Sequence, residues 1–355
     1  MTSSPVPDSP VSDPSHSASS GPASFRFGLV RVGRGPFPLR MRIGVVPWVA
    51  AAATIGLQIG YPLTSGDQRA AVTVFSVVAF FTASVSATAI SHGPARAAAA
   101  AAAAGGIGLL VESVGVHSGW PFGDYSYGTA LGPKLAGVPV VVPLAWTMMG
   151  LPALMLGRRY AARLDGTGRP AAARPTAARR ATARRAVTAR QAAVTALAGG
   201  ATLTAWDLFL DPQMVAEDYW SWQSGGGPAL NGIPVSNAAG WLLVGIVVTG
   251  ALAALLPERN ATASSAAEGP GGPAAHARGR GRTGSAGVPA DPGRRVLMVL
   301  LVWTYLSSVL ANLAFFGRPG VALAGGMAMG MLLGLSVLPD RRGAARRGNL
   351  ARSGT

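Results

Sequence analysis

The sequence predicts an all-α integral membrane protein with about eight transmembrane helices, or seven in the alternative count. Two observations favour this fold class. The composition is 49% hydrophobic and 12% charged, which is about half the charged fraction of an average soluble domain. The chain also contains apolar runs of about 20 residues, the length that a helix needs to cross a bilayer. These runs start near Ile43, Ala70, Ala97, Gly137, Gln191, Ser236, Val296 and Pro319.

The segments outside these runs define the expected domain organisation. Ser, Pro and Gly dominate residues 1–40, which are predicted to be a disordered cytoplasmic tail rather than a signal peptide. The polytopic membrane domain is expected at residues 41–340, with a basic cytoplasmic loop at 158–190 and a flexible cytoplasmic linker at 257–295. A basic cytoplasmic tail follows at 341–355. Because the chain contains no cysteine, disulfides and thiolate nucleophiles are excluded.

The placement of the arginines predicts the orientation in the membrane. A net charge of +16 would suit a nucleic-acid partner if the protein were soluble. The arginines instead gather before the first span and in residues 158–190, 259–295 and 341–352. If the spans alternate, all these segments and both termini lie on one side, as the positive-inside rule requires. We therefore expect a multi-pass protein of the cell membrane with both termini cytoplasmic and no nucleic-acid partner.

The third apolar run carries an acidic residue on a face of small residues. Gly105, Gly108, Glu112 and Gly115 follow one another at steps of three and four, so they project from one helical face. Carboxylates inside membrane-length apolar runs are costly and therefore usually functional. Two interpretations remain open: a packed helix interface in which Glu112 bonds a neighbour, or a site of chemistry or ligand contact.

The fifth run repeats this arrangement. Gly200, Thr204, Asp207 and Asp211 recur at the same steps, so the two aspartates face the same way. Asp211 could merely end the helix before Pro212 or face interfacial water. Asp207 lies one turn deeper, which strengthens its claim to a function. The segment from residue 211 to 235 has no lysine or arginine and is expected outside, together with the loop at residues 121–128.

Aromatic residues cluster near these acids and suggest a binding pocket. Interfacial belts of Trp and Tyr explain Tyr219, Trp220 and Trp222 equally well. Other aromatic side chains, inside or at the start of spans, fit a pocket better. The expected substrate-binding residues are Phe122, Tyr125, Tyr127, Trp146, Trp206, Trp241 and Asn237. No aspartate-rich pair is present to bind a diphosphate through magnesium, which argues against a prenyltransferase and leaves no expected metal site.

Two blocks of the sequence resemble a known family. The first runs from Glu112 through Pro121-Phe122-Gly123, Tyr125 and Tyr127 to Trp146, and the second runs from Trp206-Asp207 through Asp211-Pro212 and Gly232-Ile233-Pro234 to Asn237 and Gly240-Trp241. Together they resemble the membrane-embedded carotenoid biosynthesis family that includes the carotenoid 1,2-hydratases. The resemblance implies addition of water to the terminal C1,C2 double bond of an acyclic carotenoid, which gives a tertiary alcohol. It also implies membrane lipid and other carotenoid-pathway enzymes as partners.

Glu112, Asp207 and Asp211 suit an acid-catalysed hydration. Protonating an alkene requires an acid in a dry site, and a carboxyl group removed from water stays protonated more readily. We expect Asp207 to donate the proton and Asp211 or Glu112 to handle the water. No cofactor is expected, because hydration involves no net oxidation or reduction. Two other functions remain open: a transporter or binding protein that uses intramembrane carboxylates, and another carotenoid end-group enzyme such as a cyclase.

Overall fold

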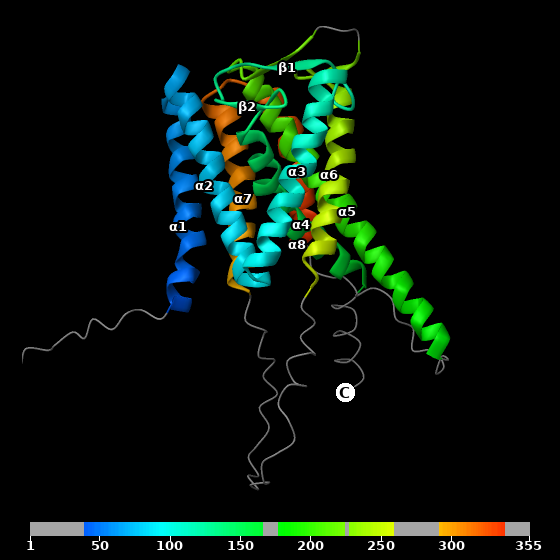
Figure 1. Ribbon diagram of the computed structural model, residues 1–355. Helices are drawn as coiled ribbons and strands as arrows, with labels where there is room; N and C mark the ends of the chain where they lie inside the picture. The colour runs from blue at the N-terminus through cyan, green and yellow to red at the C-terminus, as the bar shows by residue number, and fades with distance from the viewer. Residues whose placement is uncertain (1–38, 166–176, 224–226, 259–290, 338–355) are drawn as a thin grey trace, which may run out of the picture. The chain divides into compact units, whose positions relative to one another are not determined.

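A computed structural model of the chain describes residues 39–165, 177–223, 227–258 and 291–337. Within these residues, eight helices are long and apolar enough to cross a membrane (Figure 1). Each predicted apolar run coincides with a different helix, so the all-α membrane fold is confirmed. The helices are α1 (Leu39–Gly60), α2 (Gly66–His92), α3 (Pro94–Ser118), α4 (Val141–Asp165), α5 (Ala177–Val215), α6 (Val235–Leu255), α7 (Pro292–Ala314) and α8 (Pro319–Val337), with a short 3-10 helix, η1, at Tyr61–Leu63.

The predicted tails and linker fall mainly outside the described residues. Residues 1–38, 259–290 and 338–355 are not described, so the expected disorder stays a prediction. The predicted basic loop at 158–190 is helical at both of its ends, because α4 continues to Asp165 and α5 begins at Ala177. Residues 166–176, between these helices, also lie outside the described part.

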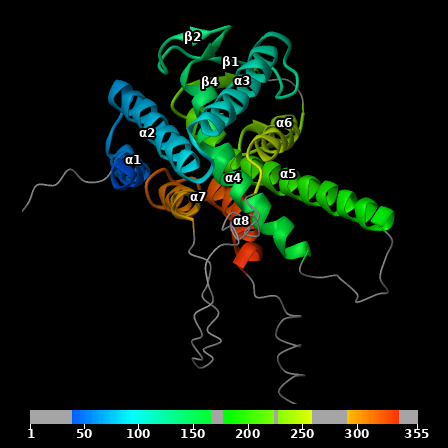
Figure 2. The same ribbon diagram turned by 60° about the horizontal axis from the view of Figure 1, so that its bottom comes forward.

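Helix α4 occupies the centre of the bundle (Figure 2). Of its membrane-spanning window, 83% is buried inside the protein, a larger share than in any other span that the structure describes. A helix buried on nearly every side must be apolar all round, and Leu151, Leu154 and Leu156 of α4 are almost fully inaccessible. The other helices surround α4 and turn one side outward.

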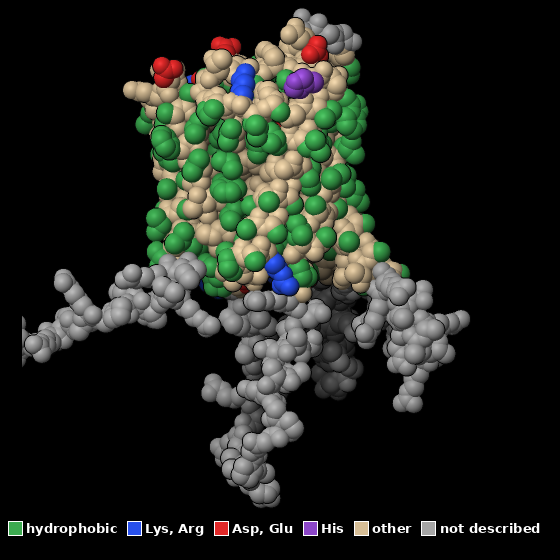
Figure 3. All heavy atoms as spheres, in the orientation of Figure 1, with side chains coloured by type: hydrophobic (Ala, Val, Ile, Leu, Met, Phe, Trp, Pro, Cys, Tyr) green, Lys and Arg blue, Asp and Glu red, His purple; other side chains and the backbone are tan. Residues whose placement is uncertain are grey.

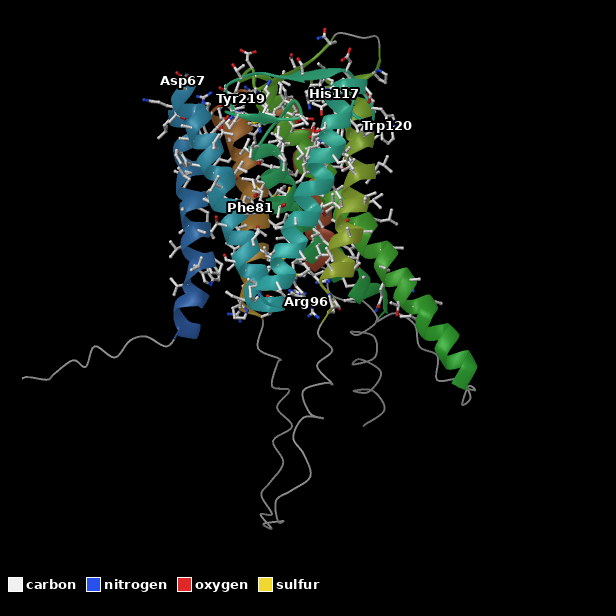
Figure 4. The ribbon with its side chains drawn as sticks, in the orientation of Figure 1. Asp67, Phe81, Arg96, His117, Trp120 and Tyr219 are labelled. Atoms are coloured by element: carbon white, nitrogen blue, oxygen red, sulfur yellow. The ribbon has the colours of Figure 1, made fainter. Side chains whose placement is uncertain are left out.

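The side of the helical bundle is hydrophobic, whereas charged side chains gather at its two ends (Figure 3). Asp67, His117, Trp120 and Tyr219 lie near one end, and Arg96 lies near the other (Figure 4). The first of these ends also carries all the short strands that the structure describes, and we call it the strand end. This distribution matches that of a protein whose sides face lipid and whose ends face water.

Short antiparallel strands join two segments that lie far apart in the sequence. Strand β1 (Tyr125–Tyr127) pairs with β4 (Trp220–Trp222), so that Tyr125 lies opposite Trp222 and Tyr127 opposite Trp220. Two smaller hairpins complete the strand end: β2 (Lys134–Leu135) with β3 (Val138–Pro139), and β5 (Ala229–Leu230) with β6 (Ile233–Pro234). The β1–β4 pair places the loop after α3 directly against the loop after α5.

Candidate active site

Glu112 lies in α3 and accepts hydrogen bonds from three aromatic side chains. Its Oε2 accepts from the hydroxyl of Tyr125 at 2.5 Å and from that of Tyr127 at 2.8 Å. Its Oε1 accepts from Nε1 of Trp146 at 3.0 Å. The side chain is buried, with 4% of its surface exposed. A carboxylate offers about four lone-pair positions, so one position, on Oε1, is left for a further donor.

The small residues around Glu112 allow these aromatic groups to approach. A Cβ atom added to Gly108 would lie 2.5 Å from Cδ1 of Trp146, and one added to Gly115 would lie 2.8 Å from the hydroxyl of Tyr125. Both positions therefore require glycine. The glycines of this face pack closely against neighbouring side chains, as a helix interface does. Glu112 on the same face also lines a cavity, so a packed interface and a ligand site are compatible here.

Tyr125 and Tyr127 remain hydrogen-bond donors at neutral pH. Burial, and then the neighbouring Glu112, raises the pKa of each phenol above its ordinary value. Both tyrosines belong to β1, which follows α3 after a short loop. The pairing with β4 holds β1 in place. The strand pairing thus positions two neutral donors toward one carboxyl group.

Asp207 and Asp211 lie one turn apart on α5 and share a partner on α6. Nδ2 of Asn237 donates to Oδ2 of Asp207 at 2.9 Å and also to Oδ2 of Asp211. Oδ1 of Asp211 accepts from Nε1 of Trp220 at 3.1 Å. Because both carboxyl groups accept from the same nitrogen atom, they lie close to each other. We call Asp207 and Asp211 the acidic pair.

Two of the open interpretations for this region can now be decided. Asp211 does not end its helix, because α5 continues through Pro212 to Val215. Tyr219 and Trp220 are buried, with 3% and 9% of their surfaces exposed, which is not the position of an interfacial belt. Trp120, by contrast, is 62% exposed and does fit a belt.

A continuous network of aromatic rings connects Glu112 with the acidic pair. Trp146 and Trp241 stack with their ring centroids 4.2 Å apart, and Trp206 meets Trp241 edge to face at 5.9 Å. On the strand side, Tyr127 donates to Glu112 and meets Trp220 edge to face at 5.5 Å, and Trp220 in turn donates to Asp211. Such contacts favour particular ring orientations.

These groups enclose a cavity in which space for the centres of water-sized molecules amounts to about 220 Å³. All seven predicted substrate-binding residues line it, together with Glu112 and Asp211. Asp207 is 1% exposed and is not in the wall, because it lies behind Asp211 and Asn237. Among the described residues, no three histidine, aspartate or glutamate side chains lie close enough to hold a metal ion.

The sequence reasoning missed several residues of the site. Trp220 and Trp222 were not assigned to the pocket, yet both line the cavity. The alternation in Trp220-Ser221-Trp222 matches that in Tyr125-Ser126-Tyr127, and this shared period of two was the available signal for a strand pair. Polar residues of α1, α2 and α7 also line the cavity, and they gave no signal because single Ser, Thr and Asn residues are common in membrane spans.

A comparison with protein families supports the resemblance. A family model described as "Carotenoid biosynthesis protein" matches residues 70–271. The chain belongs to this family. The match runs from within α2 to beyond α6, so it includes Glu112, the acidic pair and the paired strands β1 and β4.

One characterised relative is bisanhydrobacterioruberin hydratase from Haloarcula japonica. It is 34% identical over 143 residues, which are 39% of this chain and 38% of that protein. The chain therefore aligns with less than half of the length of this relative. No solved structure matches the chain.

Proposed function

We propose that this protein adds water to the terminal C1,C2 double bond of an acyclic carotenoid and forms a tertiary alcohol. One observation carries the proposal: a single aromatic cavity contains Glu112 in one wall and Asp211, backed by Asp207, in another. Hydration of an alkene needs a proton donor and a proton acceptor around a cationic carbon. The name of the Haloarcula relative supports the same reaction type.

The size of the cavity supports an end group as the bound part of the substrate. An apolar cavity of about 150 Å³ holds one benzene molecule, and the space here is about 220 Å³. The site thus accommodates a branched end group and water, and the remaining polyene lies in the membrane lipid. We further propose that both termini are cytoplasmic, which places the strand end outside.

The acidic pair supplies the proton in this mechanism. Two adjacent carboxyl groups are more stable when they share one proton, because two negative charges at this separation repel each other. Asp211 contacts the cavity and protonates C2 of the substrate. The sequence predicts this role for Asp207, but Asp207 does not line the cavity, which favours a supporting role in which it shares the proton that Asp211 donates. The proton that Glu112 takes from water then restores the shared proton of the pair before the next turnover.

Glu112 acts on the other side of the cation. Protonation of C2 leaves a tertiary cation at C1, which a water molecule attacks through its oxygen. The free lone pair on Oε1 of Glu112 accepts a proton from this water. Faces of Trp146 and Trp241 stabilise the cation by about 0.5 to 2 kcal/mol, so the carboxyl groups supply most of the effect.

Chromatography with mass spectrometry of carotenoids tests the reaction. Lycopene-producing bacteria that express the protein should accumulate a carotenoid heavier by one water for each modified end, and a longer acyclic carotenoid should be tried if lycopene is inert. A new carotenoid of unchanged mass would indicate a cyclase. Unchanged carotenoids with folded protein in the membrane would favour a transporter or binding protein.

A further inference from the structure

One part of the cavity wall, formed by residues of α7 and α2, is polar. Thr304, Ser308 and Asn312 of α7 follow one another at steps of four, so they lie one above the other on one helical face, and all three line the cavity. We call them the α7 stripe. Ser76 of α2 lines the same cavity. The α7 stripe lies outside residues 70–271, the part that the family model matches.

Two polar atoms in this wall are buried and have no partner within the protein. Oδ1 of Asn312 and Oγ of Ser76 accept and donate no hydrogen bond, although their residues are only 3% and 7% exposed. The amide nitrogen of Asn312, in contrast, donates to the Ser308 carbonyl at 2.9 Å. A buried polar atom without a partner costs about 1 to 3 kcal/mol. Bound O–H groups would satisfy both atoms.

The cavity meets a charged cluster at the strand end, above the polar wall. Arg69 pairs with Glu217 at 2.5 Å, and their side chains remain 16% and 13% exposed. Gln213 donates to the hydroxyl of Tyr61 at 3.1 Å and accepts from Arg318 at 2.6 Å. Gln213 and Tyr61 themselves line the cavity. The lining of one cavity thus includes polar groups of this cluster at the strand end, Gln213 and Tyr61, as well as Ser76 and the α7 stripe.

We propose that the α7 stripe and Ser76 bind a file of water molecules, which enters at the Arg69–Glu217 cluster and supplies the water consumed in the hydration. This inference rests on the proposed function, and it adds where water, the second substrate of the hydration, binds and from where it enters. The apolar end group occupies the aromatic side of the cavity, and water occupies the polar side. The two reactants therefore reach the acids from different directions.

Water bound in this position decides what happens to the cation. When water is in place, its oxygen bonds to C1, one of its protons passes to Glu112, and the tertiary alcohol forms. When water is absent, the cation loses a proton from a neighbouring carbon to a carboxylate and an alkene forms again. In heavy water the carboxyl groups exchange their protons for deuterons, so the atom added to C2 is deuterium. This second route therefore leaves deuterium in the recovered carotenoid.

The experiment measures the ratio of deuterated recovered carotenoid to hydrated product in heavy water. Full-length protein in membranes is given the acyclic carotenoid that the wild type hydrates. Ser76→Ala removes one unpartnered atom with little change in volume, and Asn312→Leu removes the other while keeping the branched shape of the side chain. Ser308→Leu adds bulk to the path. Leu306→Phe is the matched control, because Leu306 lies on the same helix but is 54% exposed on its outer side.

The ratio should rise about fivefold in Ser76→Ala and in Asn312→Leu, the factor that corresponds to about 1 kcal/mol for one hydrogen bond to water. It should rise further in Ser308→Leu and remain at the wild-type value in Leu306→Phe. A merely structural role would lower both products together and leave the ratio unchanged.

Three results would overturn the inference. An unchanged ratio in Ser76→Ala, Asn312→Leu and Ser308→Leu would show that the reacting water arrives elsewhere. The variants could also keep the wild-type ratio and lose activity only on carotenoids that already carry a hydroxyl group. That result would show that Ser76 and Asn312 bind the substrate and not water. Failure of the wild type to form any hydrated product would remove the proposed function, and this inference with it.

Discussion

Gly108→Ala should damage both the fold and the reaction, although alanine is a better helix former than glycine. The added Cβ would lie 2.5 to 2.9 Å from three atoms of Trp146, and real Cβ atoms do not approach other heavy atoms so closely. Trp146 would have to move. It would then lose its 3.0 Å hydrogen bond to Glu112 and its stacking on Trp241.

The expected loss of stability in Gly108→Ala is the sum of opposing contributions. Better helix propensity stabilises the alanine variant by about 1 kcal/mol. Overpacking costs about 1 to 3 kcal/mol, and loss of a hydrogen bond to a charged group costs about 1.5 to 3 kcal/mol. The net destabilisation is therefore about 1.5 to 5 kcal/mol. The hydration rate should fall as well, because Glu112 loses one of its three donors.

Gly106→Ala is the matched control, because it lies on the same helix and a Cβ there would meet nothing within 4 Å. Thermal unfolding of the purified proteins in detergent, followed by tryptophan fluorescence, gives the midpoint of each. Gly106→Ala should unfold at or above the wild-type midpoint, and Gly108→Ala well below it. Equal midpoints and equal activities for the two variants would refute the close contact between Gly108 and Trp146.

Three further predictions concern polar contacts. Glu112→Gln keeps the shape of the side chain but removes its charge, so the yield of hydrated product, measured by mass spectrometry, should fall at least about 100-fold. A yield near that of the wild type would exclude Glu112 from the reaction. Trp220→Phe keeps the ring but loses the donor to Asp211, and turnover should fall about tenfold; an unchanged rate would mean that this bond does not position the acid. Arg69→Met leaves Glu217 partly buried without its partner, which should cost about 1 to 3 kcal/mol in thermal unfolding; an unchanged midpoint would contradict this.

The number of helices and the face that each acid uses were predictable from the sequence. Membrane spans are encoded locally, in about 20 consecutive apolar residues. The steps of three and four between Gly105, Gly108 and Glu112 depend only on helix geometry. The common direction of Asp207 and Asp211 followed in the same way and is confirmed by their shared partner on α6.

Contacts between distant segments were less predictable. The shared alternation of the two segments indicates strands, but it does not specify that Tyr127 pairs with Trp220. The position of Asp207 behind Asp211 depends on where α6 presents Asn237. The polar wall was missed for the same reason, because Ser76 and Asn312 become informative only once they line one cavity.

The most direct test of the proposed reaction compares wild-type protein with Asp211→Asn in bacteria that make an acyclic carotenoid. Asn237 and Trp220 both donate to Asp211, and asparagine retains one acceptor oxygen, so the variant should still fold but has no proton to donate. Wild type should yield carotenoid heavier by one water per modified end, and Asp211→Asn should leave the carotenoid unchanged. Hydrated product at the wild-type level from folded Asp211→Asn would contradict the proposed mechanism.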